Sequence, residues 1–117
     1  MDNLTYRYLN QFCQSIGLIQ GRPNGAQDFW TNKDGSLTCT SGGGANPLFF
    51  GGTLIRFDSS DGSFGSLIVE SHDVSILDAK QAPNGAHAAV DVAYAAKEYM
   101  NNLFNPPKPE DANRSAH

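Results

Sequence analysis

The sequence has 117 residues, a hydrophobic fraction of 39% and a formal net charge of −4 at pH 7. This length is that of one domain, because a second core would bury too little apolar surface to offset the entropy lost on ordering the chain. The eight Lys and Arg residues are scattered singly, whereas binding to nucleic acid or an anionic membrane requires several cations on one face. The composition therefore argues against nucleic-acid and membrane partners, and it is compatible with a basic protein partner.

The cysteine content and the start of the chain indicate a compartment. Cys13 and Cys39 are the only cysteines; they are too few for a disulfide framework and form no CxxC motif. No apolar run approaches the length of a membrane span, and the first residues lack the basic and apolar regions of a signal peptide. We therefore expect a cytoplasmic protein in a reducing environment.

The first predicted element is a helix over residues 4–16. Its apolar residues recur at i, i+3, i+4 and i+7, which places them on one helical face: Leu9, Phe12, Cys13 and Ile16. Gly17 stands where a residue in the left-handed conformation would end the helix. The turn-forming residues that follow predict a loop over residues 18–27.

Strands are predicted next, as short runs bounded by turn residues. They cover residues 28–32, 36–40, 53–57, 64–70 and 74–80. The pairs Asp34-Gly35 and Asp61-Gly62 predict hairpins, because glycine supplies the positive φ angle that a tight turn requires. In the last strand we expect Val74, Ile76 and Asp78 on one side and Leu77 on the other.

The longest helix is predicted over residues 86–104, where alanines would let it lie close against a sheet. Prolines end this helix, and the polar segment 105–117 is expected to be a disordered C-terminal tail. The resulting prediction is one α+β domain over residues 1–104. It consists of an antiparallel sheet of about five strands flanked by an N-terminal and a C-terminal helix.

Residues 41–52 (SGGGANPLFFGG) carry the main functional prediction. A phosphate-binding loop would need a Lys and then a Ser or Thr after its glycines at the start of a helix, but here no Lys is nearby and the glycines run into Asn46-Pro47 and then a strand. Leu48, Phe49 and Phe50 are consecutive, so in an extended chain at least one of them faces solvent or a partner. These three residues, with Asn46, are therefore predicted to bind a protein. The alternative is that Leu48 and Phe50 fill the core while Phe49 covers a sheet edge.

A second set of residues has the chemistry of a metal or small-ligand site. His87 and Asp91 are spaced i, i+4 on one helical face, and the pair His72-Asp73 precedes a strand. Without a metal, both histidines would be solvated surface residues. No GxSxG, HExxH or paired-carboxylate pattern is present, and Cys39 lies in a strand, away from a helix N-terminus that would activate it.

We predict a non-catalytic protein-interaction module, such as an inhibitor, adaptor or accessory subunit, that binds a protein through the Gly-rich loop and needs no cofactor. Two alternatives stay open. One is a ligand-binding or metal-dependent hydrolytic domain that uses His72, Asp73, His87 and Asp91. The other is a subunit that forms a homodimer or small oligomer through an open sheet edge at residues 53–57.

Overall fold

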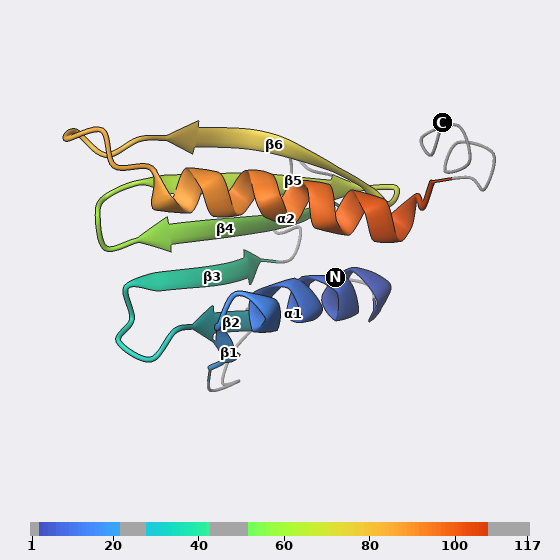
Figure 1. Ribbon diagram of the computed structural model, residues 1–117. Helices are drawn as coiled ribbons and strands as arrows, with labels where there is room; N and C mark the ends of the chain where they lie inside the picture. The colour runs from blue at the N-terminus through green and yellow to red at the C-terminus, as the bar shows by residue number, and fades with distance from the viewer. Residues whose placement is uncertain (1–2, 22–27, 43–51, 108–117) are drawn as a thin grey trace, which may run out of the picture.

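The fold is a six-stranded antiparallel sheet with two helices (Figure 1). The computed structural model describes residues 3–21, 28–42 and 52–107. The helices are α1 (Asn3–Ser15) and α2 (Ala88–Phe104). The strands are β1 (Ile19–Gln20), β2 (Asp28–Thr31), β3 (Leu37–Gly42), β4 (Thr53–Ser59), β5 (Phe64–Glu70) and β6 (Asp73–Lys80). Each strand pairs with the next one along the chain. The predicted α+β class is confirmed, with six strands instead of about five.

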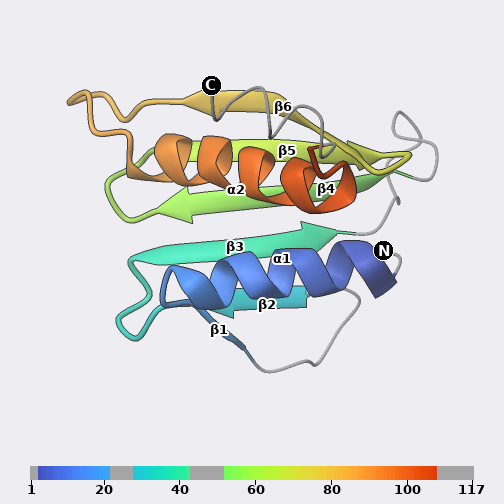
Figure 2. The same cartoon turned by 45° about the vertical axis from the view of Figure 1, so that its right-hand side comes forward.

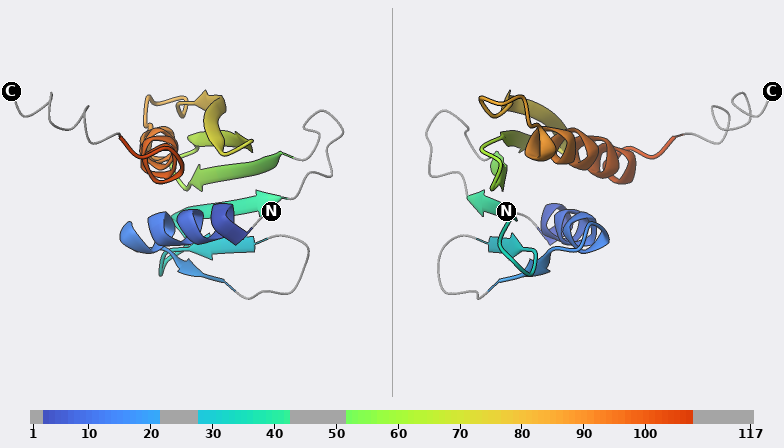
Figure 3. Two further views of the ribbon diagram at one scale, coloured as in Figure 1. Left: turned by 90° about the vertical axis from the view of Figure 1, so that its right-hand side faces the viewer. Right: turned by 60° about the vertical axis from the view of Figure 1, so that its left-hand side comes forward.

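Both helices lie side by side on the same face of the sheet (Figures 1 and 2). The further views in Figure 3 place α1 over the half that contains β2 and β3, while α2 packs against β4, β5 and β6. The helices run in opposite directions: Tyr8 of α1 packs on Phe104, and the later Phe12 packs on the earlier Tyr99. Within the described ranges, the other face of the sheet carries no helix.

The core fills the space between the helices and the sheet. Its largest fully buried side chains are Trp30, Phe57, Leu9, Leu18, Ile55, Leu67 and Met100. Trp30 donates from its indole nitrogen to Asn10 Oδ1 at 2.9 Å, which ties β2 to α1. The alanines of α2 and Gly65 of β5 let the helix lie close to the sheet. A Cβ added at Gly65 would lie 3.0 Å from the carbonyl oxygen of Ala89. None of the described helices is long and apolar enough to cross a membrane.

The predicted hairpins agree with the structure, and the helices end within about two residues of the predicted positions. Gly17, two residues after the end of α1, has a φ of 85°, and Leu18 N–H donates to the Cys13 carbonyl at 2.9 Å. This early end leaves Ile16, which was predicted on the buried stripe, outside the helix and 37% exposed. Gly35 and Gly62 have φ values of 76° and 97° in the turns after β2 and β4.

Three details of the sheet differ from the predictions. Residues 53–57 belong to β4, which pairs with β3 and β5, so this strand is interior and offers no open edge. Residues 18–27 were predicted as a loop, but β1 lies within them, because two residues are too few to show alternation. A bulge at Leu77 shifts the register of β6: Ile76 pairs with Leu67, and Asp78 pairs with Ser66. Asp78 therefore faces the side opposite to Ile76.

The conformation of the β5–β6 turn was not predicted. It consists of Ser71 and His72, between the paired residues Glu70 and Asp73. Both turn residues have positive φ, 51° and 59°, which is uncommon for residues other than glycine, although asparagine, aspartate and histidine adopt it more often than most. The backbone conformation is that of a two-residue hairpin, and it forms here without glycine.

Candidate functional site

The outer surface of the helix layer carries a groove. Its narrow part has a volume of about 340 Å³, lies between α1 and α2, and is lined by Phe12, Ala95, Glu98, Tyr99 and Asn102. Its wide part has a volume of about 620 Å³, lies along α2, and is lined by Tyr94, Ala95, Lys97, Glu98, Asn101 and Asn102. The two parts share three residues of α2 and are therefore neighbours on one surface. We call them together the α1–α2 groove.

Helical spacing explains why α2 supplies most of this groove. Ala95, Glu98, Tyr99 and Asn102 are separated by three, four and seven positions, so they lie on one face of the helix. The small Ala95 leaves a depression between its larger neighbours. Phe12 closes the narrow part from α1, and its ring centroid lies 5.5 Å from that of Tyr99.

The aromatic wall of the groove is anchored on both helices. Phe12 is 4% exposed and packs edge-on against Phe57 of β4, with ring centroids 5.9 Å apart. Tyr99 donates from its hydroxyl to Gln11 Oε1 at 3.4 Å across the helix seam. The wall is therefore held by the core and by α1 before any ligand binds.

Two polar side chains that line both parts of the groove are available for a ligand. The side chains of Glu98 and Asn102 form no hydrogen bond and no ion pair with the rest of the described chain. A carboxylate and a carboxamide thus lie next to aromatic walls with their polar atoms unused. Apolar walls with a few polar groups are the usual composition of a binding site, and volumes of about 300–1,000 Å³ are typical.

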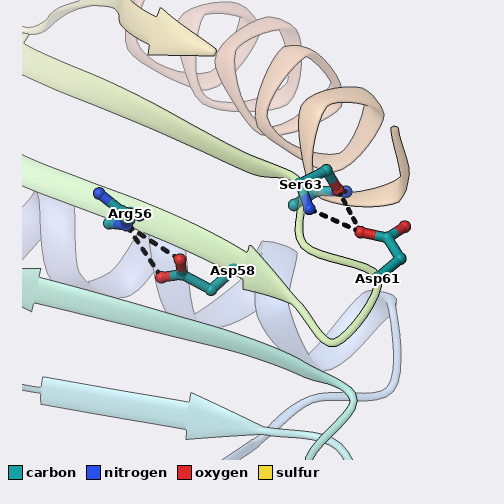
Figure 4. A network of polar contacts seen from close by, with 5 residues as sticks. Arg56, Asp58, Asp61 and Ser63 are labelled. Carbon is teal, nitrogen blue, oxygen red and sulfur yellow. Dashed lines mark hydrogen bonds and ion pairs between the residues drawn. The ribbon is translucent and has the colours of Figure 1, made fainter. Parts of the chain in front are cut away.

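The turn between β4 and β5 fixes the start of the groove-bearing helix (Figure 4). Asp61 Oδ1 accepts hydrogen bonds from Ser63 N–H at 2.8 Å and from its hydroxyl at 2.6 Å. The same two residues cap α2: Ala88 N–H lies 3.4 Å from Asp61 Oδ2, and Ala89 N–H donates to Ser63 Oγ at 3.1 Å. The Ser63 side-chain hydrogen bond is the largest cause that lowers the pKa of Asp61 below its ordinary value.

The structure separates the residues of the predicted metal site. His87 Nδ1 lies 2.7 Å from Asp91 Oδ2 at the start of α2. His72 lies at the other end, where its ring stacks on Phe104 at 4.7 Å and its carbonyl accepts from Asn105 Nδ2 at 3.1 Å. The 17 residues of α2 lie between these ends, a length of roughly 25 Å at ~1.5 Å per residue.

Only His87 and Asp91 of the four predicted ligands are therefore brought together. In the described part of the chain, no group of three or more His, Cys, Asp or Glu residues is placed to hold a metal ion.

Cys39 has the environment of a core residue. It is fully buried, and burial is the largest cause that raises its thiol pKa well above the ordinary value; the neighbouring Cys13 raises it further. The thiolate is the reactive form of cysteine, so this thiol is held in its unreactive form.

The sheet face that carries no described helix holds a smaller polar cluster, which Figure 4 views with α1 behind the strands. Arg56 Nε lies 3.0 Å from each carboxylate oxygen of Asp58. The Arg56 guanidinium also lies 4.1 Å from the ring centroid of Phe64. Both ends of the ion pair are nearly half exposed, at 45% and 44%, so it contributes little to stability.

The predicted partner-binding residues Asn46, Leu48, Phe49 and Phe50 lie outside the described residues, as do residues 108–117 of the predicted tail.

Sequence reasoning missed the α1–α2 groove: it assigned Phe12 to the core and named no other groove residue. The available signal was Ala95, a small residue on the exposed side of the predicted helix with Tyr94 and Tyr99 on either side.

No protein-family model, no curated protein and no solved structure matches this chain. The functional proposal therefore depends on the geometry and chemistry of the groove.

Proposed function

We propose that the protein is a non-catalytic interaction module that binds a segment of a partner protein in the α1–α2 groove. The observation that carries this proposal is the position of Glu98 and Asn102. Their polar groups are unused within the described chain, and they line the same hollow as the aromatic rings of Phe12 and Tyr99. Such a site supplies both apolar contact and hydrogen-bonding specificity.

The shape of the groove favours a protein segment over a compact small molecule. The narrow and wide parts adjoin through Ala95, Glu98 and Asn102, so the surface is elongated rather than enclosed. An extended or helical segment can place successive side chains into adjoining hollows, as in known modes of peptide recognition.

Tyr94 supports the same proposal from the wide part of the groove. Its side chain is large, apolar over most of its area, and 52% exposed. Tyrosine is enriched among the residues that dominate protein interfaces, because its ring gives contact area and its hydroxyl gives a hydrogen bond. Tyr94 is therefore expected to be a major contact.

A peptide selection tests this function. A displayed library of random peptides would be panned on the immobilised protein, and fluorescence anisotropy would then measure the affinity of the enriched peptides. Ala95→Gln places a longer side chain in the part of the groove that both hollows share. Ala88→Gln makes the same change at another exposed alanine of α2, outside the groove.

We expect Ala95→Gln to weaken binding at least about tenfold, equivalent to ~1.4 kcal/mol. Ala88→Gln should bind as the unchanged protein does, and both variants should keep its melting temperature. A library that yields no enriched peptide, or peptides that bind Ala95→Gln with full affinity, would refute the proposal.

The Gly-rich loop stays a second proposed contact. What supports it is the sequence argument that Leu48, Phe49 and Phe50 cannot all face one core in an extended chain. Its test is separate from that of the groove and is given in the Discussion.

A further inference from the structure

The narrow part of the α1–α2 groove indicates the chemistry of the segment that it binds. We propose that it takes a basic side chain, arginine or lysine, from the partner segment, with Glu98 as the counter-ion. This inference depends on the proposed function, because it names one feature of the segment held in the same groove.

Charge complementarity is the first argument. Glu98 is the only charged residue among the described residues that line the narrow part. Lys97 lines only the wide part. The local charge of the narrow part is therefore negative. The whole chain has a net charge of −4, so its overall field also attracts a basic segment rather than an acidic one.

The neighbouring side chains suit a cation on an aliphatic stem. The rings of Phe12 and Tyr99 line the same hollow as the carboxylate. Phe12 is only 4% exposed, so Tyr99 is the ring whose face can attract an ammonium or guanidinium group. Asn102 adds a carboxamide oxygen that can accept a further hydrogen bond. Arginine presents five N–H donors and lysine three, so either one can contact both the carboxylate and the carboxamide.

An apolar or an acidic side chain in the narrow part would leave the Glu98 carboxylate in an unfavourable state. An apolar side chain in the narrow part would remove water from the carboxylate without giving it a partner, which costs free energy. An acidic side chain would add repulsion to that cost. The same carboxylate that attracts a basic residue therefore selects against other residues.

The test uses the peptides from the groove selection. Peptides that lose affinity for Ala95→Gln should share a basic residue at one fixed position, and replacing it with glutamine should weaken binding to the unchanged protein about tenfold or more. The same replacement should change binding to Glu98→Gln less than twofold. Glu98→Asp keeps the negative charge and should keep the preference, and Glu98→Lys should instead prefer the peptide with glutamate at that position.

A matched control separates the site from general charge. Glu70→Gln removes an identical exposed carboxylate at the end of β5, outside the groove, and should leave the preference for the basic residue unchanged. Groove-dependent peptides without a shared basic residue, or an equal preference in Glu98→Gln, would overturn this inference while the proposed function stands. Selected peptides that bind Ala95→Gln with full affinity, or a selection without enrichment, would overturn both.

Discussion

The side-chain amide of Asn101 on α2 makes two hydrogen bonds with the backbone of Val74 on β6. Asn101 Oδ1 accepts from Val74 N–H at 2.9 Å, and Asn101 Nδ2 donates to the Val74 carbonyl at 2.8 Å. These are the bonds that a further strand would make at this outer edge of the sheet. Because exposed edge strands invite pairing with other chains, Asn101 protects part of β6 as well as attaching α2 to it.

Replacing Asn101 with alanine should therefore have two effects. The N–H and carbonyl of Val74 would lose their partners, which is expected to lower the free energy of unfolding by about 1–3 kcal/mol. The freed edge should also increase self-association with protein concentration. Urea unfolding and light scattering would measure the two effects.

Asn102→Ala is the matched control, because Asn102 is the next residue of the same helix and its side chain has no hydrogen bond within the described chain. It should change neither the free energy of unfolding nor the mass of the assembly measured by light scattering. If Asn101→Ala behaves like this control, the Asn101–Val74 contact neither stabilises the fold nor protects the edge of β6 from pairing.

A second prediction concerns the close packing of α2 on β5. A Cβ at Gly65 would meet the Cβ of Ala93 and lie 3.0 Å from the Ala89 carbonyl oxygen, so Gly65→Ala must push the helix away from the sheet. Overpacking of this kind costs about 1–3 kcal/mol of stability. Urea unfolding of Gly65→Ala should show this loss.

The companion variant Ala93→Gly tests the mechanism. It removes the nearest atom that the new Cβ would meet, so Gly65→Ala should cost less in the Ala93→Gly background than in the unchanged protein. Equal costs in both backgrounds would show that the side chain of Ala93 does not limit the size of residue 65.

The sequence predicted the features that local patterns specify, and it missed those that depend on contacts between residues far apart in the chain. Both long helices and most strands follow from local periodicity, and Gly35 and Gly62 mark their turns directly. The bulge at Leu77 shifts the pairing of β6 with β5, and no local pattern specifies it. The groove requires Phe12 and Tyr99 to meet across two helices that are far apart in sequence. Periodicity places each residue on a helical face, but it does not say which faces pack together.

A third prediction concerns the pH dependence of stability through Asp61. Its pKa is lowered in the folded protein, mainly by the Ser63 hydroxyl, from an ordinary value of 3.8. A carboxyl group with a lower pKa in the folded state stabilises the protein above its unfolded pKa, and this contribution is lost as the pH falls through the folded pKa. Asp61→Asn should therefore lower the urea midpoint at pH 7.

The difference between Asp61→Asn and the unchanged protein should shrink as the pH falls below about 4, because the unfolded state then binds a proton that the folded state binds only at lower pH. Asp73→Asn removes an exposed carboxylate that has no hydrogen bond within the described residues, and it serves as the control at each pH. A midpoint difference for Asp61→Asn that is constant from pH 7 to pH 3 would exclude a role for its ionised form.

The last prediction concerns Phe49 and Phe50 in the Gly-rich stretch. If they contact a partner, Phe49→Ala or Phe50→Ala should weaken its binding about thirtyfold, equivalent to ~2 kcal/mol, while the melting temperature stays unchanged. The measurement requires a full-length protein partner, retained by the unchanged chain and lost with Ala95→Gln, because a short groove peptide need not reach the loop. If both substitutions unfold the protein, the two rings are core residues, since truncating a buried phenylalanine typically costs about 3–5 kcal/mol. If both leave affinity and stability unchanged, the stretch only connects β3 to β4, and the groove alone holds the partner.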